Sequence, residues 1–555
     1  MATSLKSLFK TILLTSLAVT VPIVGIRFLG GFEGSELAAY DDFIRRRPAE
    51  TPDDRIVIVT ISDDDIEQLN QYPIHDDKFA TLLEKLDSYQ PRAIGMDISR
   101  DVPHGLPAGR VRLKQVIEQS ETIVTGCLLS TASYPGSPPA PGTPVEGVAF
   151  TEFPIDVDKT VRRVYLTSTP AKPDQTPRTN HPCNDPNNEL SSLSLATALT
   201  YLGGLGINAE PTANREIQFR QTMLKRIKSQ FGSYANADTP DYQMMLNYRG
   251  AKQIFQEIPI TRVLANKVDP KTIRDRVVLI GSTSRVTKDD FSTPFSETSS
   301  GSRTMPGVVV HAHAVSQILS AVLDNRPLIR SWSNFGEVLW IFAWSVGSGL
   351  LAFYNRRLGL FVIGLVGIGL ALWGICYSVF LAQGLWVPFV PTLTVAILTA
   401  IAVRVLDLAG RSGYTQAIYE QIKDQIQGQG ASRDRRGDYL ENLVQRARKA
   451  RQGQTATELL SLGTEPLATA TPEMQALYQQ ITAQVKADVA KEQSAQQPAI
   501  PQSGSLTGIA QPRSNSKTNR IQDLLNRAQE TRSAQPPRDD GTIIENSSAA
   551  QKPYD

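Results

Sequence analysis

The sequence predicts three parts: an extracytoplasmic α/β domain with a mostly parallel sheet, an α-helical transmembrane bundle, and a cytoplasmic tail that is partly helical and partly disordered. Residues 358–403 contain no Asp, Glu, Lys or Arg, which suffices for two membrane crossings of about 20 residues each. Before residue 330, short β-branched runs alternate with helix-like segments. After residue 406 the chain is polar, and its last part is rich in Gln, Pro, Ser and Gly.

The apolar segments define the expected membrane spans. An uncharged run at 11–26 follows Lys6 and Lys10, and we expect an N-terminal signal anchor, or transmembrane helix, over 1–30. The alternative is a cleaved signal peptide. Further transmembrane helices are expected at 332–355, 358–381 and 385–405.

Basic residues near these spans predict the orientation. Arg356 and Arg357 separate the second and third spans, and Arg404 and Arg411 follow the fourth, whereas the turn at 382–384 has no Lys or Arg. Because basic residues concentrate in cytoplasmic loops, the tail is expected in the cytoplasm and residues 31–330 outside it. The chain is thus expected to be a multi-pass protein of the cell's inner (plasma) membrane.

The residues of the outer domain predict a β-α-β-α-β order, which implies parallel strands with right-handed crossovers. Strands are expected at 55–61, 93–98 and 123–129, and helices at 63–70, 76–88 and 111–120. Residues 147–153 and 161–167 alternate enough to predict a hairpin across Asp156–Asp158. Later elements are a helix at 190–202, strands at 242–248 and 276–280, and a helix at 308–323.

The composition excludes few classes of function. A net charge of +2 gives no bulk attraction to nucleic acid. The three cysteines make no disulfide framework, and Cys376 lies within a membrane span. Cys127 ends an apolar run, which favours a buried free thiol. A disulfide with Cys183 is the alternative if the compartment is oxidising.

Polar residues follow several predicted parallel strands, where ligands of open α/β sheets bind. The candidate ligand-binding residues are Asp63, Asp97, Ser282, Thr283 and Asp290. A carboxylate cluster there would hold a cation or an amine. The alternative is structural: Asp63 would cap a helix, and Asp97 would accept hydrogen bonds from nearby backbone.

No catalytic site, metal or cofactor is expected. His311 and His313 are two residues apart, which places them on different faces of a helix. Gly281–Arg285 lacks the rest of a phosphate-loop pattern. A hydrolase using Asp63 and Asp97 is disfavoured because no nucleophile–base pair accompanies them. The tail has no nucleotide-binding or kinase motif, and no His follows His313.

The tail is expected to be helical over 406–492 and disordered over 493–555, with a short helical motif at 519–532. Two segments of it echo each other at helical spacing. We interpret both as docking surfaces for a partner, formed by Leu440, Leu443 and Arg446 and by Ile521, Leu524 and Arg527. A chance match of two amphipathic turns is the alternative.

Seven short segments in order resemble a CHASE domain of the second type, an extracellular sensing module associated with bacterial cyclases and kinases. They are 56–63, 92–98, 156–163, 246–250, 277–283, 290–294 and 305–312. The three helices after the domain also fit that family's layout. The chain departs from it at Tyr72-Pro73-Ile74, where a Trp-Pro-Trp-like element is usual, and at His313, where Asn is usual. The usual catalytic effector is missing.

The resemblance implies sensing, and we therefore expect a membrane-anchored receptor that is not an enzyme. Its expected partners are an extracytoplasmic ligand or protein, a cytoplasmic signalling protein that binds the tail, membrane lipid, and a second copy in a possible homodimer; nucleic acid is not expected. The alternative is a membrane scaffold or assembly factor whose outer domain binds another protein without signalling.

Overall fold

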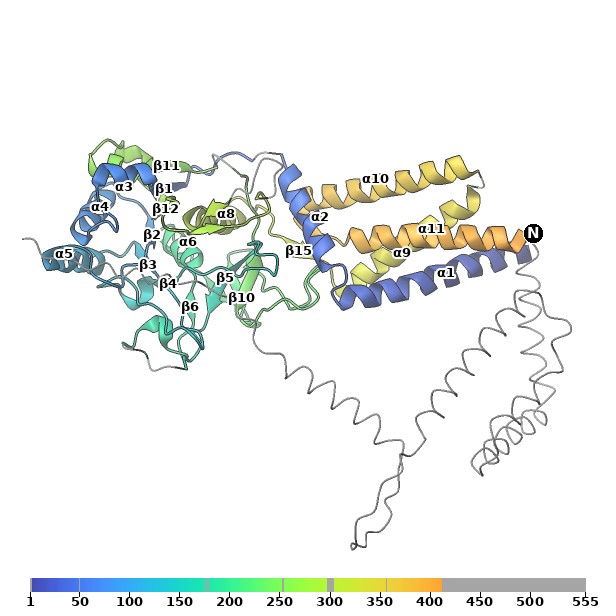
Figure 1. Cartoon of the computed structure of the whole chain (residues 1–555), viewed down its shortest axis with the longest axis horizontal. Coiled ribbons are helices and arrows are strands. Elements are labelled where there is room, and N and C mark those ends of the chain that lie inside the picture. Colours follow the sequence, from blue (N-terminus) through green and yellow to red (C-terminus); the bar gives the residue numbers. More distant parts are fainter. Residues whose placement is uncertain are drawn as a thin grey trace, which may run out of the picture. The chain divides into compact units, whose positions relative to one another are not determined.

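A six-stranded parallel sheet forms the centre of the domain that precedes residue 334 (Figure 1). The computed structural model describes residues 2–411 apart from 49, 175–176, 178, 252–253, 297–303 and 356. The strand order is β11-β1-β12-β2-β3-β4, and every neighbouring pair is parallel. This confirms the mostly parallel sheet. The strands are β1 (Ile56–Ile61), β2 (Ala93–Asp97), β3 (Ile123–Cys127), β4 (Val148–Phe150), β11 (Gln256–Pro259) and β12 (Val277–Ser282).

Alternate residues of β1 enter two different hydrophobic layers, because successive side chains of a strand point to opposite faces. Val57, Val59 and Ile61 pack with the apolar side chains of α4, α5 and α7, whereas Ile56 and Ile58 pack with those of α6 and α8. Helices therefore cover both faces of the sheet. They are α3 (Asp63–Leu69), α4 (Asp76–Ser88), α5 (Pro107–Glu118), α6 (Leu193–Gly203), α7 (Ile260–Leu264) and α8 (Gly307–Leu323).

The hairpin predicted across Asp156–Asp158 is wrong. β4 joins the large sheet beside β3, while β5 (Arg163–Ser168) pairs antiparallel with β10 (Tyr242–Met245) and β6 (Leu190–Ser191) in a second sheet. The apolar side chains of β5 explain the difference, because Val164 and Leu166 are buried in the layer that contains α6 and α8. Shorter strands are β7 (Glu210–Pro211), β8 (Ile217–Phe219), β9 (Thr222–Leu224), β13 (Asp290–Phe291), β14 (Met305–Pro306), β15 (Arg330–Ser331) and β16 (Leu385–Trp386).

Four helices are long and apolar enough to cross a membrane. They are α1 (Ala2–Phe28), α9 (Asn334–Tyr354), α10 (Leu358–Gln383) and α11 (Val390–Arg411). α1, α9 and α11 pack against one another (Figure 1). Ser345 of α9 and Thr399 of α11 join their hydroxyl groups at 2.8 Å. Small residues allow this approach, since a Cβ at Gly349 would lie 3.0 Å from Ile12 of α1.

An additional helix, α2 (Glu33–Arg46), lies between α1 and β1 and was not predicted. Leu37, Tyr40 and Ile44 recur at helical spacing and are buried, so a signal for this helix was present in the sequence.

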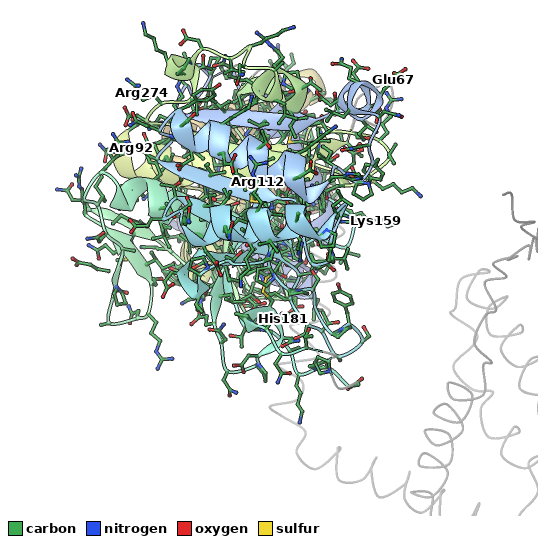
Figure 2. The ribbon with its side chains drawn as sticks, turned by 90° about the vertical axis from the view of Figure 1, so that its left-hand side faces the viewer. Glu67, Arg92, Arg112, Lys159, His181 and Arg274 are labelled. Carbon is green, nitrogen blue, oxygen red and sulfur yellow. A yellow bond between two sulfur atoms is a disulfide. The ribbon has the colours of Figure 1, made fainter. Side chains whose placement is uncertain are left out.

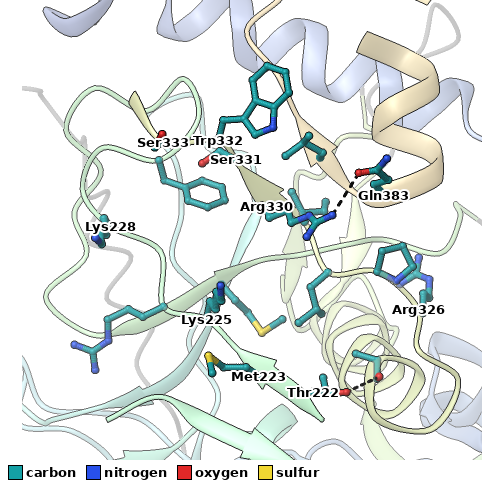
Figure 3. Close-up of a pocket in the computed structure, with 18 of the residues that line it drawn as sticks. Thr222, Met223, Lys225, Lys228, Arg326, Arg330, Ser331, Trp332, Ser333 and Gln383 are labelled. Carbon is teal, nitrogen blue, oxygen red and sulfur yellow. Dashed lines mark hydrogen bonds between the residues drawn. The ribbon is translucent and has the colours of Figure 1, made fainter. Parts of the chain in front are cut away.

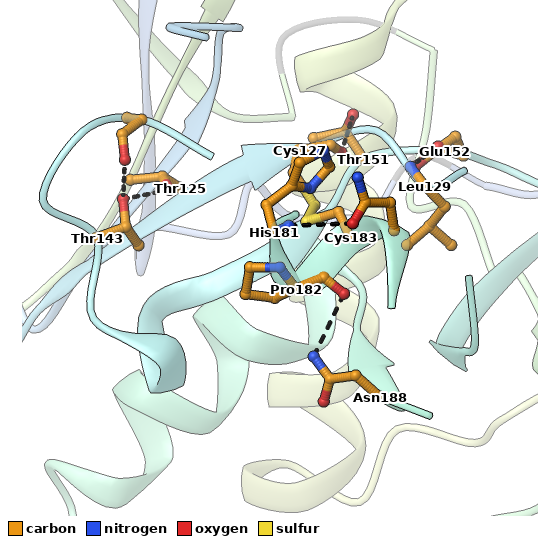
Figure 4. The surroundings of a disulfide bond; sticks show 12 residues. Thr125, Cys127, Leu129, Thr143, Thr151, Glu152, His181, Pro182, Cys183 and Asn188 are labelled. Atoms are coloured by element: carbon orange, nitrogen blue, oxygen red, sulfur yellow. Dashed lines mark hydrogen bonds between the residues drawn. A yellow bond between two sulfur atoms is a disulfide. The ribbon is translucent and has the colours of Figure 1, made fainter. Parts of the chain in front are cut away.

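Cys127 and Cys183 form a disulfide, so the prediction of a free thiol is wrong (Figure 4). Cys127 ends β3, and 56 positions of sequence separate it from Cys183. The Cys183 carbonyl accepts a hydrogen bond from the Ser130 N–H at 2.9 Å, which holds the later loop against the chain that leaves β3. The apolar run that favoured a buried thiol is indeed buried, but its end meets a loop that is remote in sequence.

The docking surfaces at Leu440, Leu443 and Arg446 and at Ile521, Leu524 and Arg527 lie outside the described residues, as does all of the chain after residue 411. They stay predictions.

Candidate functional site

The carboxyl ends of β1, β12 and β2 are adjacent, so the candidate ligand-binding residues come from one edge of the sheet. Ile61 is opposite Ser282, and Gly281 is opposite Asp97. Asp63 follows β1 and Asp97 ends β2, and β12 lies between these two strands. The edge therefore has two parts, one around Asp63 and one around Asp97.

The first part is a hydrogen-bonded turn after β12. The Ser284 hydroxyl donates to Asp63, and the Thr287 hydroxyl donates to Ser282 Oγ at 3.0 Å. Thr283 contributes through its backbone, because its N–H donates to the Ile61 carbonyl at 3.0 Å. The cap of α3 is Ser62 rather than Asp63, since Ser62 Oγ accepts the N–H of Asp65.

The second part brings Asp97 near Asp289, a residue that is not among the predicted site residues. The Asp97 side chain is only 10% exposed. Its burial, with the charge of Asp289, raises the pKa of Asp97 well above its usual value. Burial and the charge of Asp290 likewise raise the pKa of Asp289. Asp290 itself is exposed and pairs with Pro306 between β13 and β14.

The Asp289 carboxylate lies close to the start of α8. A Cβ at Gly307 would lie 2.7 Å from Asp289 Oδ2, so a larger residue at this position would require the carboxylate to shift. The Gly307 N–H also donates to the Asp289 carbonyl at 3.0 Å.

His311 lies beside this pair but is neutral. Burial lowers the pKa of His311 to about 3. Its Nε2 donates to the Thr151 carbonyl at 3.2 Å, so Nδ1 accepts the hydroxyl of Ser194 at 2.8 Å. At neutral pH its 3.8 Å approach to Asp97 is therefore not an ion pair. His311 has a structural role, fixing α8 to α6.

His313 is also buried, and burial lowers its pKa to about 3. Its Nδ1 accepts the Arg249 N–H at 3.3 Å. Among the described residues, no three His, Cys, Asp or Glu side chains are grouped so as to hold a metal ion. The chemistry that the Asp97–Asp289 pair can offer is to share a proton or to bind a cation or an amine.

Asp97→Asn is expected to stabilise the protein at neutral pH. A carboxyl group whose pKa rises on folding contributes stability that is present below its unfolded pKa and is lost as pH rises through its folded pKa. Each unit of that rise costs about 1.4 kcal/mol at neutral pH. The midpoint temperature of thermal unfolding of the full-length chain should therefore fall less steeply between pH 4 and pH 8 in Asp97→Asn than in the wild type. The exposed control Glu67→Gln (Figure 2) should behave as the wild type. Equal pH dependence of the wild type and Asp97→Asn would contradict the inference that burial raises the pKa of Asp97.

A second cluster of charges lies within the outer domain and is centred on Arg162, whose side chain is 2% exposed. We call it the Arg162 network: Asp41, Asp156, Asp158, Arg162 and Arg163. Arg162 donates to Asp41 at 2.7 and 2.8 Å, to Asp156 at 2.9 Å and to Asp158 at 2.6 Å. Burial alone would lower the pKa of Arg162, but its carboxylate partners outweigh the burial and raise this pKa.

The same network is closed by Arg163 and Tyr234. Arg163 donates to Asp156 at 2.8 Å and to Gln243 at 2.7 Å, and the Tyr234 hydroxyl donates to Asp156 at 2.6 Å. Sequence comparison with the resembled family pointed to 156–163, but not to Asp41, because α2 was missed.

Asp41 of α2 belongs to the Arg162 network, and other residues of the same helix contact α10 and β16. Tyr40 packs on Phe380 of α10 and on Trp386 of β16, at ring distances of 5.6 and 5.0 Å. Phe43 packs on Tyr377 at 5.8 Å. The Tyr377 hydroxyl donates to the Arg46 carbonyl, at the end of α2, at 2.6 Å.

Glu36 of α2 holds the beginning of α11. Its Oε1 accepts the N–H of Phe389 at 2.9 Å and the N–H of Val390, and its Oε2 accepts the Ser233 hydroxyl at 2.8 Å. Burial raises the pKa of Glu36 although these hydrogen bonds lower it in part. A helix of the outer domain thus caps a membrane helix.

Comparison with known proteins identifies the family. The family model described as CHASE2 domain matches residues 16–350, from within α1 to within α9. No curated protein matches the chain, and no solved structure does. The matched region contains the parallel sheet, the Arg162 network and α2. Because the match covers more than half of the chain, and agrees with the segments that predicted it, the chain belongs to the CHASE2 family of extracellular sensory domains.

Proposed function

We propose that the chain is a membrane sensor whose outer domain passes a signal through its membrane helices to a separate cytoplasmic partner. One observation carries this proposal: α2 joins the Arg162 network to the membrane helices. Asp41 on this helix binds Arg162, and Glu36 on the same helix binds the first amides of α11. A change in the position of α2 would therefore reach α11 directly.

The Arg162 network offers a place where the signal can act. The Asp158 side chain is 50% exposed, whereas that of Arg162 is buried. A ligand or protein that draws Asp158 away from Arg162 would leave Asp41 to balance more of the arginine's charge. Such a ligand shifts the conformational equilibrium only if it binds the two states differently.

The Asp97–Asp289 pair supports a ligand of positive charge at the sheet edge. α8 begins beside this pair at Gly307, and the chain continues from the end of α8 through β15 into α9. A cation or amine bound at the sheet edge would therefore act on an element that leads into the membrane. Asp63, Ser282 and Thr283 would line the neighbouring part of the same edge.

The Cys127–Cys183 disulfide supports the proposed orientation, since disulfides persist in oxidising compartments outside the cytoplasm. The distribution of basic residues agrees. On this orientation the tail is cytoplasmic, in the inner membrane of a bacterium. Because the sequence of the tail carries no effector motif, its amphipathic segments around Leu440 and Ile521 would recruit a separate signalling protein.

Asp158→Asn is expected to speed hydrogen exchange at the Phe389 and Val390 amides about threefold or more in the full-length chain in nanodiscs, because a weaker network loosens α2. Glu36→Gln, which weakens the cap itself, should speed exchange there about tenfold. Exchange is read by mass spectrometry of peptides that cover 385–395.

The matched control is Glu33→Gln. Glu33 lies on the same helix but accepts the N–H of Ala235 within the outer domain, so exchange at 389–390 should not change. If Glu36→Gln speeds exchange but Asp158→Asn does not, the network is not coupled to the membrane helices. The rival function, a scaffold that transmits nothing, would then be favoured.

A further inference from the structure

A cavity of about 1250 Å³ lies where the outer domain meets the ends of two membrane helices (Figure 3). One wall is β9 with the segment that follows it, 225–231. The other is the connection from α8 to α9, 325–335, together with the end of α10. The parallel sheet and its candidate ligand-binding edge take no part in this cavity.

The walls are strongly basic. Lys225, Arg226, Lys228, Arg326 and Arg330 line the cavity, and no Asp or Glu does. Arg326 is paired with Glu50 at 2.6 Å. Within the described part of the chain, the other four form no ion pair. Unpaired cations in one concave surface attract an anion.

Two of these four cations are held in place by uncharged groups. The Arg226 guanidinium lies 4.8 Å from the ring centre of Tyr242, and Arg330 donates to Gln383 at 3.4 Å. Lys225 and Lys228 are exposed, and both are on the wall formed by the outer domain (Figure 3). The positive charge is thus divided between the β9 wall and β15, the strand that leads into α9.

The cavity lies at the level where the membrane begins. Its wall includes Asn334, the first residue of the α9 span, and Gln383, the last residue of the α10 span. Trp332 and Phe335, which also line it, are 39% and 78% exposed. Tryptophan is typical of the headgroup region, and an exposed Phe in the first turn of a membrane span requires apolar cover.

We propose that this cavity binds the anionic headgroup of a phospholipid from the leaflet on the side of the outer domain. The phosphate would lie among Lys225, Lys228 and Arg330, and an acyl chain would cover Phe335. Positive charge on both walls and an apolar rim at a membrane boundary suit a lipid better than a soluble anion, which needs no such rim. The bound lipid would join the outer domain to α9 and α10.

The test is native mass spectrometry of the full-length chain in neutral detergent, titrated with phosphatidylglycerol or phosphatidylcholine. The wild type is expected to bind one phosphatidylglycerol saturably and at least about tenfold more tightly than phosphatidylcholine. Lys225→Gln with Lys228→Gln should weaken phosphatidylglycerol binding by about tenfold or more. Both lysines are exposed, so this double variant is expected to fold.

The charge-matched control is Lys267→Gln with Lys271→Gln. These exposed lysines follow α7, which packs on α4 at the end of the domain away from the membrane helices (Figure 1). An equal loss in this control would mean unspecific attraction and overturn the proposal, as would equal binding of the two lipids. Glycerophosphoglycerol, the headgroup without acyl chains, should compete at least about tenfold more weakly than the lipid. Equal competition would identify a soluble anion as the occupant and overturn the lipid assignment.

Discussion

Replacing Arg162 with Leu is expected to destabilise the outer domain by about 3–5 kcal/mol, because it leaves buried carboxylates without their partner. Asp41 and Asp156 are both buried, and each lies within 2.9 Å of the Arg162 guanidinium. Pulse proteolysis of the full-length chain in urea would measure the loss. Arg112→Leu, which breaks an exposed pair with Glu84, should cost no more than about 1 kcal/mol.

The double variant Arg162→Leu with Asp41→Leu separates unpaired charge from lost packing. It removes the carboxylate that depends most on Arg162, since Asp156 keeps Arg163. Part of the stability should therefore return. If the double variant is less stable than Arg162→Leu by the full cost of Asp41→Leu alone, the two side chains do not interact as described.

Loss of the disulfide, through Cys127→Ser with Cys183→Ser, is expected to cost about 4 kcal/mol, because the bond closes a long loop in the unfolded chain. The separation of 56 positions sets this value. The same urea assay would measure it. Wild type treated with dithiothreitol should fall to the stability of the double variant, and the double variant should not respond to dithiothreitol.

Cys376→Ser is the control, because Cys376 is a free cysteine within α10. The Cys376→Ser variant should lose stability in dithiothreitol to the same extent as the wild type. A wild type that is equally stable with and without reductant would show that the bond contributes nothing.

The parallel sheet was predictable because its signal is local. β1 and β12 are short β-branched runs buried at every position, and the helix that follows β1 begins with a capping signal at Ser62–Asp65. Such runs are typical of strands covered by helices on both faces. The four helices that are long and apolar enough to cross a membrane were predictable for a similar reason, since length and apolar character are local properties of the sequence.

Pairing between distant segments was not predictable in the same way. The alternation in 147–153 and 161–167 is compatible with a hairpin, and only the burial of Val164 and Leu166 beside α6 and α8 assigns β5 to another sheet. The partner of Cys127 depends on the path of a long loop. No residue near Cys127 in the sequence indicates where that loop returns.

The candidate site was predictable in part. Asp97 stood at a strand end, and the sheet order then determined its surroundings. Asp289 was missed because the turn before β13 brings this residue, rather than Asp290, to the start of α8. Asp41 was missed because the polar residues of α2 obscured an apolar stripe.

The pairing of β15 with β16 limits how the membrane helices can move. Arg330 and Ser331, just before α9, pair with Leu385 and Trp386, which connect α10 to α11. The beginning of α9, the end of α10 and the beginning of α11 therefore share one joint. A displacement of that joint would shift these three helix ends together. The bundle would then have few degrees of freedom, because its helices could not respond to the outer domain one by one.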